Sequence, residues 1–523
     1  MSSLVLSDVA YAFPDDTPLF TGLDLTVGPG LTSLVGRNGA GKSTLLRLSA
    51  GELTPSHGAI SVDAEPARPP SVAYLPQQLA DAPAARTLAD ELGVGSRLAA
   101  IERIEEGRGR DDDFATIGDD WSVAGRSVAL LAELGLPTDL GRPLGALSGG
   151  ERTLAALAGR LLSGPRVLLL DEPTNNLDRR ARARLFDALD RFTAGRDRLA
   201  LVVSHDLELL ERVDATVELR AGRCRVFGGP YSHYREVVDA EQAAALQSLT
   251  GARNDLRAER RDKAEGAEKA SRRVAQGRRV QAAGGMPKIL MNARRSSAQE
   301  SAGRLRAVHE QGVEQARARM QAADAGVRRE DLLRIPMPDP GLPAGRIVLD
   351  TLDPVAGRVH LAGSARVRVA GPNGSGKTTL LRRLLDDDDD EVVHVPWALL
   401  PQDLRIEHPD RSVVDEIRAV RPEADPEQVH AHAARMLFTG EAGFRALGDL
   451  SGGERLRAAL AARLFARPVP QLLVLDEPTN NLDLDGVEVL ADALAQWRGA
   501  LVLVSHDDAF CERVGVDDVI TLA

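Results

Sequence analysis

The sequence predicts an α/β protein in which one domain with a mixed, largely parallel sheet occurs twice, with a helical segment between the copies. Three observations predict this fold class. A glycine-rich loop with a lysine occurs twice, each time between a β-branched run and a leucine-rich helix start. An apolar run ending in Asp-Glu also occurs twice, which is typical of a strand buried on both faces of a parallel sheet. A stretch almost free of proline separates the copies.

Composition limits the class of protein. The chain has 523 residues, a net charge of −12 and two cysteines, Cys224 and Cys511. No apolar run reaches the roughly 18 residues that a membrane span needs, and the start of the chain lacks the features of a secretory signal. We therefore expect a cytoplasmic protein whose cysteines are buried thiols. The acidic balance argues against nonspecific nucleic-acid binding by the whole surface, but a local basic patch is compatible with it.

The two glycine-rich loops match the phosphate-binding pattern G-x-x-x-x-G-K-[ST]. Their backbone N–H groups would surround a polyphosphate, the lysine would reach the terminal phosphates, and the next hydroxyl would bind Mg²⁺. One short match is often accidental, but two of the five lysines in this chain occupy these loops. The residues are Gly36, Asn38, Gly39, Gly41, Lys42, Ser43 and Thr44 in the first copy, and Gly371, Asn373, Gly374, Gly376, Lys377, Thr378 and Thr379 in the second.

Residues on either side of the loops are further candidates for nucleotide contacts. Phe13 precedes the first loop and would either stack on an adenine or serve as an ordinary strand residue. Gln77 ends an apolar run and would coordinate Mg²⁺ or water, unless it is merely solvated; Gln402 stands at the same place in the second copy. Residues 341–370 contain no Phe, Tyr or Trp. We therefore predict that the two sites differ in nucleotide affinity.

Each copy also contains a Leu-Ser-Gly-Gly-Glu segment before a helical run. The serine and glutamate fit a capping box, which is a purely structural interpretation. The paired glycines at the positive end of a helix also form an anion site, which is the functional interpretation. The residues are Ser148, Gly149, Gly150 and Glu151 in the first copy, and Ser451, Gly452, Gly453 and Glu454 in the second.

Acidic residues and a histidine follow the apolar strands of each copy. Ligands bind at the carboxyl ends of parallel strands, where the aspartate would serve Mg²⁺ and the glutamate would polarise an attacking water. A lone histidine at a strand end is more often structural, but its place after the other motifs favours a functional role. The residues are Asp171, Glu172 and His205 in the first copy, and Asp476, Glu477 and His506 in the second.

Residues 230–340 differ from both copies and predict a helical hairpin with its tip near residues 282–296, where Gly284–Pro287 breaks the helical pattern. Residues 271–306, called the basic stretch below, contain nine arginines or lysines and one acid. Such a stretch on an acidic protein suits a polyanion contact, although a solvated helical spacer would also explain it. The candidate RNA contacts are Arg272, Arg273, Arg278, Arg279, Lys288, Arg294 and Arg295.

These motifs occur in the same order in both copies, and the set resembles the ATP-binding cassette family over residues 1–229 and 341–523. The resemblance implies that two cassettes, each with a helical subdomain, close head-to-tail within one monomeric chain around ATP and Mg²⁺. Lys42 would then share a site with Ser451 and Gly453, and Lys377 with Ser148 and Gly150. Glu172 and Glu477 would be general bases. His205 and His506 would contact the γ-phosphate.

The basic hairpin between the cassettes makes the chain similar to the ABC-F proteins, which are soluble ATPases of the ribosome. That resemblance implies a linker that reaches rRNA and tRNA, and a role in translation, in rescue of stalled ribosomes or in antibiotic resistance. The stretch from Glu91 to Trp121 stands where the family carries an arm, although Asp111–Asp113 make it acidic. The alternatives are an ATPase subunit of an exporter with separate membrane subunits and a DNA-maintenance ATPase.

Overall fold

The computed structural model describes most of the chain. It leaves out residues 1–2, 64–70, 78, 80–85, 176, 196, 283–287, 329–334, 336, 373, 386–391, 402–407, 451, 480–481 and 523. The described residues form two compact units. One unit holds both copies of the repeated domain, which we call cassette 1 (residues 1–231) and cassette 2 (residues 334–523). The other unit is the linker, residues 232–333.

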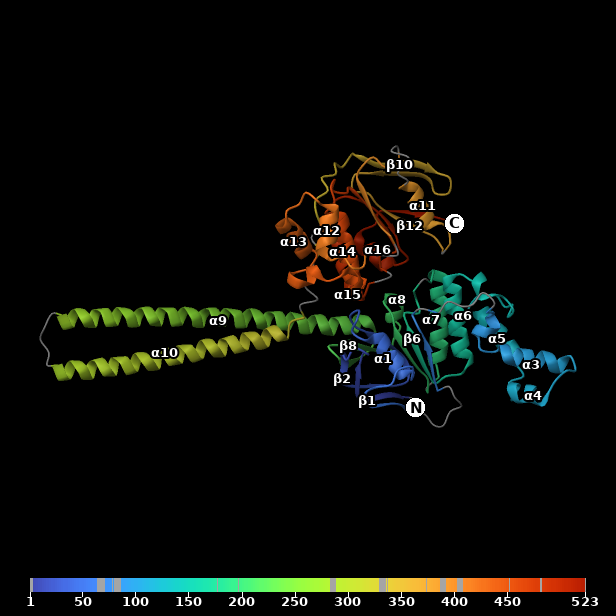
Figure 1. The fold of residues 1–523 in the computed structure, drawn as a ribbon, viewed down its shortest axis with the longest axis horizontal. Helices are drawn as coiled ribbons and strands as arrows, with labels where there is room; N and C mark the ends of the chain where they lie inside the picture. The colour runs from blue at the N-terminus through green and yellow to red at the C-terminus, as the bar shows by residue number, and fades with distance from the viewer. Residues whose placement is uncertain are drawn as a thin grey trace. The chain divides into compact units, whose positions relative to one another are not determined.

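Cassette 1 is built on two β-sheets (Figure 1). Its strands are β1 (Ser3–Ala12), β2 (Pro18–Val27), β3 (Gly30–Val35), β4 (His57–Asp63), β5 (Val72–Leu75), β6 (Val167–Asp171), β7 (Leu199–Val203), β8 (Ala215–Arg220) and β9 (Arg223–Gly228). The smaller sheet is antiparallel, with the order β2-β1-β4. The larger has the order β5-β6-β7-β3-β8-β9, in which β8 and β9 pair antiparallel and the other neighbours pair parallel.

The helices of cassette 1 follow the predicted pattern. They are α1 (Lys42–Ser49), α2 (Leu88–Glu91), α3 (Gly95–Glu105), α4 (Asp111–Ile117), α5 (Val123–Glu133), α6 (Gly149–Leu162), α7 (Arg179–Thr193) and α8 (Leu207–Leu210). Helices α2 to α6 form the helical subdomain, between strands β5 and β6 in the chain. The apolar run that becomes β6 is buried along its whole length. Its alternate residues enter two different cores, one on each face of the sheet, as its composition predicts.

The acidic run in the predicted arm has a structural role. Asp111 to Asp113 form the first turn of α4, where negative charge is favourable to the helix dipole. Asp113 is buried, accepts a hydrogen bond of 3.1 Å from Arg103 Nε, and accepts one of 2.9 Å from the backbone N–H of Arg110. The run therefore stabilises the packing of α4 against α3.

Cassette 2 repeats this plan, with fewer strands among its described residues. Its strands are β10 (Ile347–Asp353), β11 (Gly357–Ala362), β12 (Arg366–Ala370), β13 (Trp397–Leu400), β14 (Leu472–Asp476), β15 (Ala500–Val504) and β16 (Asp518–Thr521). Its helices are α11 (Lys377–Leu384), α12 (Val413–Val420), α13 (Pro426–Arg435), α14 (Gly452–Leu464), α15 (Leu484–Gln496) and α16 (Asp508–Val514). Its parallel sheet has the order β13-β14-β15-β12-β16, and its small sheet pairs β10 with β11. The tandem α/β fold class predicted from the sequence is thus confirmed.

The linker contains two long helices, α9 (Tyr231–Ala282) and α10 (Lys288–Ala325), which lie side by side (Figure 1). The side chain of Gln242 donates to the carbonyl of Arg328 and accepts from its N–H, both at 2.9 Å. Farther along, Lys263 and Glu310 form an ion pair of 3.6 Å. Two paired helices are confirmed, but the second helix begins at Lys288, inside the tip that was predicted near residues 282–296. The residues after Pro287 are good helix formers, so the break extends less far than predicted.

Both cysteines are free thiols. Burial raises the pKa of the half-buried Cys224 to about 12 and that of the buried Cys511 to about 11. Neither thiol would ionise at neutral pH, so both act as small apolar residues.

Candidate functional site

Each phosphate-loop lysine is the first residue of a helix. The glycine before it has a left-handed conformation, with φ of 100° at Gly41 and 89° at Gly376. A side chain with a Cβ would be strained at either position, so the turn requires glycine. The turn leaves the free N–H groups of the first helical turn facing the loop, which suits an anion.

Both lysine ammonium groups are held by carbonyl groups of their own loops. Lys42 Nζ donates to the carbonyl of Arg37 at 3.1 Å, and Lys377 Nζ donates to that of Gly371 at 2.9 Å. Burial lowers the pKa of both lysines, while neighbouring carboxylates oppose the shift. Each loop therefore presents a partly desolvated cation beside a helix N-terminus, a combination that attracts phosphate.

The glutamates after β6 and β14 have an unusual backbone conformation. Their φ values are 50° at Glu172 and 46° at Glu477. A left-handed backbone costs a non-glycine residue about 1 kcal/mol or more, and such strain concentrates at functional sites. The same strain recurs in both cassettes, so it belongs to the shared site.

A histidine faces each of these glutamates. His205 Nε2 lies 3.0 Å from Glu172 Oε1, and His506 Nε2 lies 3.3 Å from Glu477 Oε1. Burial raises the pKa of Glu172 to about 8 and that of Glu477 to about 7. Burial also lowers the pKa of His205 to about 3 and that of His506 to about 4. The imidazoles are therefore neutral at pH 7, and each glutamate titrates near neutral pH, as suits a general base.

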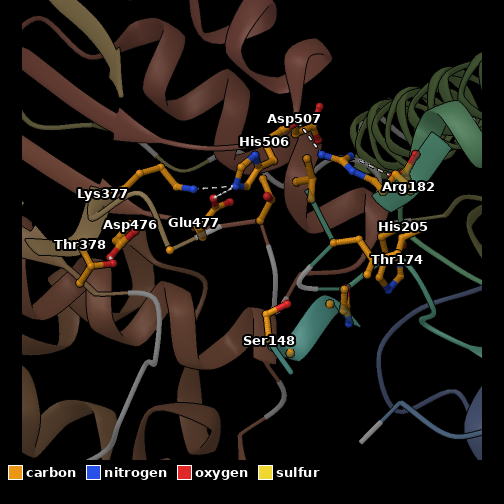
Figure 2. A pocket seen from close by; sticks show the side chains of 18 of the residues that line it. Ser148, Thr174, Arg182, His205, Lys377, Thr378, Asp476, Glu477, His506 and Asp507 are labelled. Carbon is orange, nitrogen blue, oxygen red and sulfur yellow. Dashed lines mark hydrogen bonds and ion pairs between the residues drawn. The ribbon is translucent and has the colours of Figure 1, made fainter. Parts of the chain in front are cut away.

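A cavity of about 510 Å³ contains residues of both cassettes. Figure 2 shows Lys377 directed toward His506, whose Nε2 lies 3.0 Å from the lysine Nζ. The lining includes Ser148, Gly149 and Gly150 of cassette 1, with Gly374, Gly376, Lys377, Thr378, Thr379, Asp476, Glu477 and His506 of cassette 2. The cavity thus brings the second phosphate loop together with the first Ser-Gly-Gly segment.

A second cavity, of about 540 Å³, surrounds the first phosphate loop. Its lining includes Phe13, Asn38, Gly39, Gly41, Lys42, Ser43, Thr44, Gln77, Asp171, Glu172 and His205 of cassette 1, and Arg455 and Leu482 of cassette 2. Phe13 is 40% exposed, and the ring of Tyr11 packs against its ring edge to face, with an interplanar angle of 81°. By contrast, the described lining of the 510 Å³ cavity includes no Phe, Tyr or Trp.

Some sequence-predicted residues do not line these cavities in the described part of the chain. Glu151 instead completes the capping box, accepting from the N–H of Ser148 at 2.8 Å, so the structural interpretation of that glutamate is confirmed. Glu454 accepts a hydrogen bond of 2.8 Å from Arg445. Gly452 and Gly453 lie in the first turn of helix α14, and Gly453 is not among the described residues that line either cavity. Gly36 and Gly371 are not among the lining residues, but their carbonyl groups accept hydrogen bonds from the ammonium groups of Lys42 and Lys377. Asn373, Gln402 and Ser451 lie outside the described residues.

The oxygen atoms beside each phosphate loop fit a magnesium ion. Thr378 Oγ1 donates to Asp476 Oδ2 at 2.8 Å, and the Tyr74 hydroxyl donates to Asp171 Oδ2 at 3.3 Å. Burial raises the pKa of Asp171, and hydrogen bonds from Ser43 and Tyr74 partly oppose this rise. No cluster of three or more metal-ligating side chains occurs among the described residues. Mg²⁺ would therefore depend on phosphate oxygens for further ligands, as is usual for this ion.

Two contacts between the cassettes involve residues that the motifs did not single out. The backbone N–H of Asn38 donates to Asp483 Oδ2 at 2.8 Å. Arg182 of α7 donates to the carbonyl of His506 at 2.9 Å. The sequence does contain a clue to the second contact. The two copies differ at this position, which is Arg182 in cassette 1 and Val487 in cassette 2.

The basic stretch lies on both linker helices. Arg272, Arg273 and Arg279 are exposed on α9, and Arg272 pairs with Glu268 one turn away. Lys288, Arg294 and Arg295 belong to α10 and not to the predicted tip loop. Within the described part of the chain, no helix is long and apolar enough to span a membrane.

Comparisons with known proteins agree with this architecture. A family model described as ABC transporter matches residues 20–175 and 358–480. The tylosin resistance ATP-binding protein TlrC of Streptomyces fradiae is 34% identical over 544 residues, covering 94% of this chain and 92% of the relative. The ATP-binding protein Uup of Caulobacter vibrioides is 32% identical over 532 residues, covering 98% of this chain and 76% of the relative.

A solved structure of the complex of archaeal ribosomal stalk protein aP1 and archaeal ribosome recycling factor aABCE1 shares the fold. Its TM-score is 0.53 at 18% identity, covering 98% of this chain and 87% of that chain. The duplicated motifs, the fold and these relatives lead to one conclusion. The chain belongs to the ABC transporter family, within its ABC-F branch, and it is an ATPase.

Proposed function

We propose that this ATPase works in the cytoplasm as a monomer, binds the ribosome through the basic stretch of its linker, and modulates translation or protects it from antibiotics. The single observation that carries this proposal is the charge of the linker. Nine arginines or lysines accompany one acid in residues 271–306, on a chain with a net charge of −12. Such a local positive field favours the phosphates of RNA. Arginine suits them because its guanidinium is forked and permanently charged.

The proposed roles in hydrolysis follow from the two sites. Lys42 and Lys377 bind the terminal phosphates, and Phe13 stacks on the adenine of one site. Glu172 and Glu477 accept the proton of the attacking water as its oxygen bonds to the γ-phosphorus and the bond to ADP breaks. His205 and His506, neutral at pH 7, contact the γ-phosphate. Mg²⁺, when held by Ser43 and Asp171 with Gln77, or by Thr378 and Asp476 with Gln402, neutralises phosphate charge.

ATP-dependent closure of the cassettes would connect hydrolysis with ribosome binding. Support comes from the composition of the 510 Å³ cavity, where Ser148 and Gly150 face the loop of Lys377. A triphosphate held in such a cavity contacts both cassettes, so nucleotide binding favours the closed arrangement over the open one. Hydrolysis then removes that differential contact and permits release.

The first experiment is ribosome co-sedimentation of the double variant Glu172→Gln/Glu477→Gln with and without ATP. Glutamine preserves nucleotide binding but removes the base, so ATP should hold the variant on ribosomes. In that background, four arginines of the basic stretch are changed to glutamine, and four that come earlier in the sequence of the same helix provide the matched control. The test set is Arg272, Arg273, Arg278 and Arg279, and the control set is Arg253, Arg257, Arg260 and Arg261.

The proposal requires the test set to lose ribosome binding and the control set to retain most of it. Equal loss in both sets would indicate a nonspecific charge effect. If the double variant instead sediments with membranes and ignores ribosomes, an exporter ATPase subunit becomes the better interpretation and the linker is a spacer.

Antibiotic resistance is the more specific form of the proposal. It is favoured by the 34% identity to a protein named for tylosin resistance. Expression of the wild-type chain in a tylosin-sensitive bacterium should raise the inhibitory concentration of tylosin, and the double glutamine variant should not. An unchanged inhibitory concentration at matched expression would favour a role in translation without this drug.

A further inference from the structure

Helix α7 begins with positive charges that are unfavourable at the N-terminus of a helix. Residues 179 to 184 read Arg-Arg-Ala-Arg-Ala-Arg, although cations are unfavourable at the positive end of a helix. Helix α15 follows the same motif in cassette 2 and begins Leu484-Asp485, with an acid in its first turn. The arginines of α7 therefore need a reason outside the helix.

Arg182 shows what one of these arginines does. Its Nη1 donates to Asp206 Oδ2 and its Nη2 donates to the carbonyl oxygen of His506, both at 2.9 Å. The side chain of Arg182 is 16% exposed and that of Asp206 is 6% exposed. Figure 2 shows Arg182 extending toward the segment of His506 and Asp507. One guanidinium thus joins the residue after His205 in cassette 1 to His506 in cassette 2.

The backbone that Arg182 holds carries a side chain of the Lys377 site. His506 Nε2 lies 3.0 Å from Lys377 Nζ and 3.3 Å from Glu477 Oε1. A change in the position of the His506 carbonyl would displace the imidazole and both contacts. Because the donor comes from cassette 1, the contact exists only while the cassettes are closed on one another.

The reciprocal contact is chemically impossible at the Lys42 site. Arg182 stands four residues after Asp178, the N-cap of α7, and Val487 stands four residues after Asp483, the N-cap of α15. The side chain of valine has no hydrogen-bond donor, so it cannot hold the carbonyl of His205. The two sites therefore differ in this contact by sequence, whatever nucleotide they contain.

We propose that Arg182 is a positioning residue through which cassette closure controls hydrolysis at the Lys377 site and not at the Lys42 site. This inference rests on the proposed contact of His506 with the γ-phosphate. In the closed state Arg182 fixes the His506 backbone, which orients the imidazole beside Lys377 and Glu477. When the cassettes separate, the donor leaves and that site loses its orientation. The Lys42 site closes without such a link.

The experiment isolates each site with one glutamine substitution in the full chain. In the Glu172→Gln background, Arg182→Ala should lower the kcat of ATP hydrolysis about tenfold or more with little change in KM, because a hydrogen bond from a charged donor is lost. In the Glu477→Gln background, the same change removes only the partner of Asp206 beside His205 and should lower kcat clearly less than at the Lys377 site. The matched control is Arg180→Ala, which removes an exposed arginine from the same helical turn and should leave both sites unchanged.

Three further variants make the result decisive. Arg182→Lys keeps the charge beside Asp206 with fewer donors and should recover part of kcat, while thermal melting checks that each variant folds. Arg182→Ala added to His506→Ala should cause no further loss. Equal losses at both sites, or independent effects of the two substitutions, would overturn the proposal. If His506→Ala has no effect, both the proposed role of His506 and this inference fail. If His506→Ala lowers kcat but Arg182→Ala does not, only this inference fails.

Discussion

The two ATP sites should respond to pH at different midpoints. Burial raises the pKa of Glu172 to about 8 and that of Glu477 to about 7, from the usual 4.5. A general base accepts a proton only when ionised, so hydrolysis should rise as pH passes each pKa. Each site should therefore lose activity as pH falls through the pKa of its own glutamate.

The assay is kcat/KM for ATP against pH, because this ratio reports ionisations of the free enzyme. Glu172→Gln leaves the Glu477 site and should give a midpoint near pH 7, while Glu477→Gln leaves the Glu172 site and should give one near pH 8. The histidines should not titrate in this range, because burial lowers the pKa of His205 to about 3 and that of His506 to about 4.

The double glutamine variant supplies the background rate, and melting curves at each pH exclude unfolding as the cause of any loss. Coincident midpoints in the two single variants would refute the assignment of different environments to the two glutamates. Midpoints near 4.5 would refute more, since they would mean that burial does not hold these carboxyls in their neutral form.

Three other predictions follow from the same sites. In a Lys377→Ala background, Phe13→Ala should weaken ATP binding about two- to tenfold in calorimetry, since aromatic stacking contributes about 0.5–1.5 kcal/mol. Equal ATP affinities of the Lys42→Ala and Lys377→Ala variants would contradict the predicted difference between the two sites. Tyr74→Phe should raise the Mg²⁺ concentration for half-maximal hydrolysis at the Lys42 site, because Asp171 loses a donor at 3.3 Å; the Lys377 site, read in the same titration, should not change. The folded-state pKa of Glu477 is raised, so the contribution of this carboxyl to stability should fall as pH rises from 4.5 to about 7. Glu477→Gln removes that titration and should raise the melting temperature above pH 7 relative to wild type, while no gain would mean that the carboxylate is well solvated.

Most of the fold was predictable because each decisive signal is local. The Asp-Glu strand ends, the loop before Lys42 and the capping box at Ser148 are short segments whose conformation depends on neighbouring residues. Because each segment occurs twice in the same order, a chance match in one copy is tested by the other. The parallel sheet and the paired linker helices follow from such segments.

What could not be predicted depends on residues far apart in the chain. Arg182 looks like a solvated charge on a helix until the fold places it at the carbonyl of His506, 324 residues away. Tyr74 looks like a strand residue until β5 pairs with β6 and brings its hydroxyl to Asp171. The start of α10 was missed for another reason, since a proline between two helices marks a boundary without fixing where the second helix begins.

The differences between the cassettes lie where one cassette meets the other. The first turn of α7 is basic and that of α15 is acidic, and each acts on a charge across the interface, Arg179 on Asp508 and Asp485 on Lys42. A basic first turn opposes its own helix dipole, and Arg182 offsets part of that cost within cassette 1, through Asp206, and part across the interface, at the carbonyl of His506. A duplicated domain under selection for folding alone would have no use for this pattern. We infer that the asymmetry favours one closed register of the two cassettes and makes its two ATP sites unequal.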